Sequence, residues 1–170
     1  MQVNAYPEFL EVVLFPTEIE LLRSILHEID RAYGIPIDQL ETTVRNVWFS
    51  GEGFRSAEMD REDIREWNQA LRDFRGENRS RCQEWTGLLA QGGDPLLWRV
   101  ARREIDTLIT ILNDYRLYQA ARHEIGQTQM DEDFDFVQSP NLRLALLEIH
   151  FLAWLMEMIL QAMTSENKET

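Results

Sequence analysis

The sequence predicts an all-α single domain, built as a bundle of four to five helices with room for a short extended segment near its beginning. Apolar residues recur at steps of three and four over several long segments, and short polar connections separate those segments. Only 8 Gly and 5 Pro occur in 170 residues, which disfavours a loop-rich all-β fold. A chain of this length can bury one domain core but is short for two. We therefore expect one helical domain over 1–163 and a flexible tail over 164–170.

The first elements are an extended segment and a capped helix. The run LEVVLF (10–15) is apolar and β-branched enough for a short extended segment. A helix is expected from Thr17, where a capping box with Glu20 satisfies free backbone amides, and Gly34 supplies its end.

A weaker helical pattern over 35–50 is followed by a predicted loop with the sequence SGEGFRSAEM (50–59). A longer pattern resumes at Asp60, with one potential break at Gly76, and continues to the turn at 90–94.

Asp94-Pro95 is typical of a helix start, because proline is favoured at the first helical position. The next helix is therefore expected from residue 95 or 102 to Ile125, with an end at Gly126. The segment 127–138 is predicted to be an acidic connection.

The final helix, expected over 140–163, is apolar over the length of a membrane span. Glu148, His150 and Glu157 lie inside it, and ionised carboxylates are costly in lipid. We therefore expect this segment to be the central helix of the bundle, covered by the others, and we expect no membrane contact.

The net charge of the chain limits the kinds of partner that it can bind. Thirty acidic residues against 17 basic ones give a net charge of −13, which disfavours contact with nucleic-acid phosphates. The single cysteine, Cys82, excludes a disulfide framework, and no secretory signal begins the chain. These observations predict a cytoplasmic protein.

Three polar residues interrupt the apolar helix over 107–126: Asn113, Asp114 and Arg116. Arg116 falls on the main apolar stripe and needs a partner if it is buried. Glu148 in the final helix also has apolar neighbours at helical spacing, so we expect it to pair with Arg116. This buried polar network has two interpretations, a pocket that binds a ligand and an ion pair that fixes helix register.

A second group lies on the helix over 60–89, where four arginines provide a face for anions or a partner: Arg72, Arg75, Arg79 and Arg81. Guanidinium groups near Cys82 could lower the pKa of its thiol, which a redox sensor needs. The alternative is that Cys82 is a small core residue, since it lies three residues before Trp85.

Motifs for metal binding and catalysis are missing from the sequence. The three histidines are isolated, and no Glu lies three residues before a His, as a di-iron bundle requires. No nucleophile elbow, phosphate loop or dinucleotide fingerprint occurs. We expect no metal, no cofactor and no enzymatic activity.

The order of the segments EWNQALRDFRGENRSRCQEWTGLL and ITILNDYRLYQAARHEIG, followed by the apolar final helix, resembles a bacterial family filed as a domain of unknown function. Part of that family is described as oxidative-stress transcriptional regulators. The hexad at 112–117 resembles the family's Leu-Asn-Asp-x-Arg-Leu signature, which implies special roles for Asn113, Asp114 and Arg116. The redox-responsive members resemble a design with two nearby cysteines, whereas this chain has only Cys82.

The sequence therefore predicts a non-enzymatic regulatory protein that acts through protein–protein contact. One alternative is a transcriptional regulator that contacts DNA through the arginine-rich helix. Another is a small-molecule or metal sensor that uses the polar core around Arg116 and Glu148.

Overall fold

The computed structural model describes residues 1–49, 61–130, 137 and 139–166. Its elements in chain order are β1 (Gln2–Ala5), β2 (Phe9–Leu14), α1 (Pro16–Tyr33), the 3-10 turn η1 (Ile37–Gln39), α2 (Thr42–Phe49), α3 (Arg61–Leu89), β3 (Leu96–Ala101), the 3-10 turn η3 (Arg102–Glu104), α4 (Ile105–Arg122), α5 (Gln127–Met130) and α6 (Pro140–Glu166). The predicted loop at 50–59 lies outside the described residues, as do 131–136 and 138 of the acidic connection and 167–170 of the tail.

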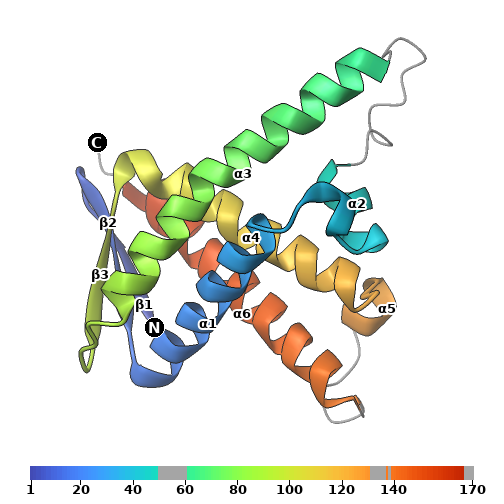
Figure 1. Ribbon diagram of the computed structural model, residues 1–170. Helices are drawn as coiled ribbons and strands as arrows, with labels where there is room; N and C mark the ends of the chain where they lie inside the picture. Colours follow the sequence, from blue (N-terminus) through green and yellow to red (C-terminus); the bar gives the residue numbers. More distant parts are fainter. Residues whose placement is uncertain (50–60, 131–136, 138, 167–170) are drawn as a thin grey trace.

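The fold is α+β, so the all-α prediction is wrong. Three antiparallel strands form a sheet in the order β1-β2-β3, which lies at one side of the helices (Figure 1). Leu10 on β2 faces Val100 on β3, and both side chains are fully buried. The extended segment expected at 10–15 is thus the central strand of a sheet.

The third strand replaces the predicted beginning of a helix. In β3, Leu97 and Arg99 are exposed whereas Trp98 and Val100 are buried, which is the alternation of a strand with one buried face. The Asp94-Pro95 pair therefore precedes a strand, and α4 begins only at Ile105. Pairing with β2, a contact distant in sequence, decides the structure of this segment.

Helices α1 and α3 begin and end close to the predicted positions, whereas α4 ends at Arg122, three residues before the predicted end at Ile125, and the predicted connection begins with the short helix α5. Helix α1 begins at Pro16, one residue before the predicted cap, and Glu18 accepts a hydrogen bond from the Phe15 backbone amide at 2.9 Å. Helix α3 runs through Gly76 without a break, and its N-terminal part projects beyond the other helices (Figure 1). Helix α4 packs against α2 and α6, while α1 packs mainly against α3.

Helix α6 is buried on one side only, so the expectation that other helices cover it is wrong. Leu152, Leu155 and Ile159 are fully buried, while several large apolar side chains of the same helix are exposed. Within the described residues, Pro140–Ser165 is the one stretch of helix long and apolar enough to cross a membrane by length and composition. The helix also continues to Glu166, three residues past its predicted end.

Candidate functional site

A buried ion pair joins α3 to α4. The Arg75 Nε donates to the Asp114 Oδ2 at 3.1 Å, and both residues are less than one-tenth exposed. The Tyr33 hydroxyl, at the end of α1, donates to the same oxygen at 2.9 Å. The Arg75 guanidinium also lies 4.9 Å from the centre of the Trp48 ring in α2 and donates to the Trp48 carbonyl. Four helices therefore meet at this one ion pair.

This arrangement assigns Asp114 a structural role. Burial and the Asp114 carboxylate raise the pKa of the Tyr33 hydroxyl well above its ordinary value, which keeps that hydroxyl a hydrogen-bond donor. A carboxylate that accepts from a guanidinium and a phenol satisfies the condition under which a charge can be buried.

The expected pair of Arg116 and Glu148 does not form. Arg116 is half-buried, and its Nε has no hydrogen-bond partner among the described residues. Asn113 is exposed on the outer side of α4. Of Asn113, Asp114 and Arg116, the structure therefore brings only Asp114 into a buried polar group.

Glu148 instead belongs to a second polar cluster between α1, α4 and α6. The Tyr115 hydroxyl lies 2.8 Å from the Glu148 Oε2 and 3.0 Å from the Glu28 Oε2. The Gln119 Nε2 donates to the Tyr115 hydroxyl at 2.6 Å and to Glu148 at 3.0 Å. Arg122, at the outer side, donates to Glu28 at 2.8 Å.

A proton count constrains this cluster. The Tyr115 hydroxyl carries one proton, so it donates to only one of its two carboxylate neighbours. The second contact becomes a hydrogen bond when that carboxyl is protonated. Burial and the nearby Glu28 carboxylate raise the pKa of Glu148, although hydrogen bonds from Tyr115 and Gln119 oppose that shift. Glu148 is therefore the carboxyl suited to hold the extra proton.

A cavity of about 270 Å³ adjoins this cluster. Its walls include Glu28, Gln119 and Glu148 together with Ser24 and His123. The Gln119 Oε1 is buried and has no hydrogen-bond partner among the described residues. The cavity therefore lies beside two carboxyl groups, those of Glu28 and Glu148, which suits a ligand that donates hydrogen bonds.

The four arginines of the predicted anion face are not brought together in one exposed face. Arg75 points inward to Asp114, and Arg79 pairs with Asp30 at 2.9 Å. Arg81 pairs with Glu84 and Glu104, and Arg72 is exposed on α3. Local carboxylates thus pair with three of these four guanidinium groups, those of Arg75, Arg79 and Arg81.

Cys82 is fully buried in the core of the domain. Burial first, and then the Asp30 carboxylate, raise the pKa of the thiol to about 12. This direction is opposite to the lowering that a redox-sensing thiol needs. The structure agrees with the interpretation of Cys82 as a small core residue.

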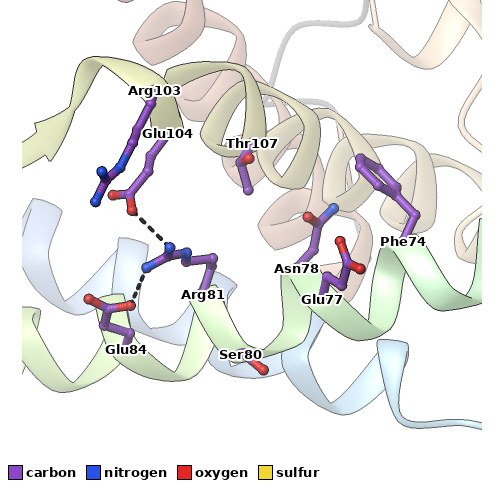
Figure 2. A pocket seen from close by; sticks show the side chains of 9 residues that line it. All are labelled: Phe74, Glu77, Asn78, Ser80, Arg81, Glu84, Arg103, Glu104 and Thr107. Carbon is purple, nitrogen blue, oxygen red and sulfur yellow. Dashed lines mark hydrogen bonds and ion pairs between the residues drawn. The ribbon is translucent and has the colours of Figure 1, made fainter.

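A groove of about 530 Å³ lies between α3 and the η3–α4 corner. Figure 2 shows Arg81 and Glu84 on α3 below Glu104, with the two ion pairs of Arg81 drawn as dashed lines. Asn78 points toward α4 from the same helix, and its buried Nδ2 has no hydrogen-bond partner among the described residues. The charges of the groove are mostly paired with one another.

A row of apolar side chains along α6 is only partly covered by the other described residues, and Phe151 in it also packs against the core. We call this row the α6 seam: Leu144, Leu147, Phe151, Trp154 and Met158. Leu144 is 54% exposed, Leu147 45% and Trp154 47%, whereas Phe151 and Met158 are half-buried. The steps of three and four are those of the apolar positions in a coiled coil.

Sequence reasoning missed Glu28, Tyr115 and Gln119 as a polar cluster and missed the α6 seam. Tyr115 and Gln119 are four residues apart and so share a face of α4, which was a signal for a joint role. The spacing of the seam is also visible in the sequence, but a helix this apolar predicts burial on all sides. Among the described residues, no group of three or more His, Cys, Asp or Glu side chains could hold a metal ion.

The fold and these clusters define an α+β domain whose polar core groups tie helices together and whose last helix exposes an apolar row. The chain belongs to the family described as domain of unknown function DUF2017, whose model matches residues 7–163. No curated protein and no solved structure matches the chain. The resemblance to an uncharacterised domain family is thus confirmed.

Proposed function

We propose that this chain is a cytoplasmic, non-enzymatic regulatory protein that acts through protein–protein contact at the α6 seam. The observation that carries this proposal is the exposure of Leu144, Leu147 and Trp154 in one row on a well-formed helix. Contiguous exposed apolar surface is unfavourable in water unless another molecule covers it.

The chemistry of the seam favours a helical protein partner. Apolar side chains at steps of three and four form a straight stripe along a helix, which a second helix can cover by interdigitation. Trp and Phe within the stripe are residue types that anchor protein interfaces.

The non-enzymatic part of the proposal rests on the partners of the buried ionisable groups. Asp114 is held by Arg75 and Tyr33, and the raised pKa of Cys82 makes it a poor nucleophile. The sequence resembles a family of which part is described as oxidative-stress transcriptional regulators, and this resemblance supports a regulatory role.

The size of the native complex in cell lysate tests this proposal. We expect the tagged chain to elute from a size-exclusion column in a species larger than its own mass, and we expect Leu147→Lys and Trp154→Lys each to abolish that species. Leu160→Lys is the matched control, because Leu160 is 52% exposed on the same helix but lies off the seam. Equal elution of all four proteins would contradict the proposal.

A second candidate function is small-molecule binding in the cavity beside Glu148. The carboxyl groups of Glu28 and Glu148 in the cavity wall favour a ligand with an ammonium group. A panel of primary amines tests this candidate, since a bound ligand raises the melting temperature by mass action. The Gln119→Ala variant should lose that rise.

A further inference from the structure

We propose that the molecule covering the α6 seam is a second copy of this chain, with the two α6 helices packed antiparallel about a two-fold axis. This inference rests on the proposed function, because it names the occupant of the same surface. A two-fold interface requires one patch to be complementary to itself. The seam meets this requirement in side-chain volume and in charge.

The first argument is the pairing of apolar layers. Each heptad of a coiled coil has two apolar positions, called a and d. In an antiparallel pair of helices, position a of one helix lies opposite position d of the other. One register places Leu144 opposite Trp154 of the partner subunit and Leu147 opposite Phe151 of the partner subunit. Each layer then combines a leucine with an aromatic ring, so the four central layers have nearly equal volume.

In a parallel pair of α6 helices, the side-chain volume would differ more from layer to layer. Each side chain would then face its own copy, so two indole rings would share one layer while two leucines shared another. The packing of large against small favours the antiparallel arrangement.

The second argument is charge. Arg143 and Glu157 are exposed and flank the seam on the same side of α6, at equivalent heptad positions. The antiparallel register that aligns the apolar layers places Arg143 opposite Glu157 of the partner subunit, and the symmetry makes this ion pair twice.

The hydrogen bonds that Arg143 and Glu157 already make allow them to form this ion pair between subunits. The Arg143 Nη2 donates to the Val137 carbonyl at 2.8 Å, and the Gln161 amide donates to the Glu157 Oε1 at 3.0 Å. These bonds hold the two side chains near the helix and leave the Glu157 Oε2 as an acceptor. In a parallel pair, the position facing Arg143 would be Glu148, which is buried and already bonded to Tyr115.

Sedimentation velocity of the purified full chain tests this inference. We expect a dimer whose dissociation constant rises about tenfold in Arg143→Glu and in Glu157→Arg, because each change places like charges opposite one another twice. The combined variant Arg143→Glu/Glu157→Arg reverses both charges and should restore the parent's dissociation constant. Circular dichroism of each variant verifies that it folds.

Three results would overturn the inference: a parent that stays monomeric up to about 100 μM, a combined variant weaker than either single one, or flotation of the chain with phospholipid vesicles through Leu147 and Trp154. Failure of the proposed function can be distinguished from failure of the dimer inference by two further outcomes. A monomeric parent whose large lysate species still depends on Leu147 retains protein contact with a different partner. A parent without any such species loses both proposals.

Discussion

Arg75 and Asp114 form a buried ion pair between α3 and α4, with 3.1 Å from the Arg75 Nε to the Asp114 Oδ2. The pair replaces the expected contact of Arg116 with Glu148. The Tyr33 hydroxyl donates to Asp114 and the Trp48 carbonyl accepts from Arg75, so the pair fixes how α1 and α2 meet α3 and α4.

Removal of one partner of this pair should be strongly destabilising. We expect Arg75→Leu to lower the free energy of unfolding by about 3–5 kcal/mol, because Asp114 becomes an uncompensated buried charge. The double variant Arg75→Leu/Asp114→Leu should lose less than the sum of the two single losses. Urea unfolding of the four proteins measures this coupling, and strictly additive losses would contradict it.

Glu148 should make stability depend on pH. Burial and Glu28 raise its pKa above the ordinary 4.5, so the folded chain holds this proton more tightly than the unfolded chain. The stability contributed by the group is therefore full at acid pH and is lost as pH rises through the raised pKa.

The Glu148→Gln variant removes this titration. Relative to the parent, it should gain stability between acid and neutral pH, because it has no carboxyl group that loses its proton over that range. Melting temperatures across that range measure the gain, with Glu20→Gln on α1 as an exposed control. A difference that does not change with pH would disprove this role of Glu148.

The Cys82 thiol should be inert in the folded protein. A pKa raised from 9.0 to about 12 leaves roughly a thousandfold less thiolate near neutral pH, in addition to steric protection by the core. Reaction with a chromogenic disulfide reagent should therefore be slow until denaturant is added. Rapid modification under native conditions would revive the redox interpretation.

The third strand should contribute to the core through Trp98. Its ring lies edge-on to Trp85 at 5.8 Å between ring centres, and it is nearly fully buried. We expect Trp98→Ala to cost about 3–5 kcal/mol in urea unfolding. The neighbouring Leu97→Ala should cost less than about 1 kcal/mol, because Leu97 points to solvent. Similar losses of unfolding free energy at Trp98 and Leu97 would be inconsistent with a strand that buries only one of its faces.

Local pattern predicted the helices well and the sheet poorly. In α4, the predicted apolar stripe is buried, with Ile105, Leu108, Leu112 and Tyr115 all in the core. Helical periodicity and end signals are local, so they can be recognised in the sequence. The strand at Leu96–Ala101 exists because it pairs with Phe9–Leu14, and no local pattern reports such a partner.

The polar groups show the same limit. Asp114 was recognised as unusual within an apolar helix, but its partner Arg75 was assigned to an outward face. Choosing among sixteen arginines requires the rotation of α3 relative to α4, which depends on packing between helices. The spacing of the α6 seam was visible, whereas its exposure depends on which faces the other elements cover.

The most direct measurement of the central claim is photo-crosslinking of the chain in the cells that produce it, with a benzoylphenylalanine in place of Leu147. We expect a protein adduct at this seam position and none when the same group replaces Leu160, which is slightly more exposed on α6 but lies off the seam. Equal adducts at both positions, or none at Leu147, would contradict the assignment of the seam as the contact surface.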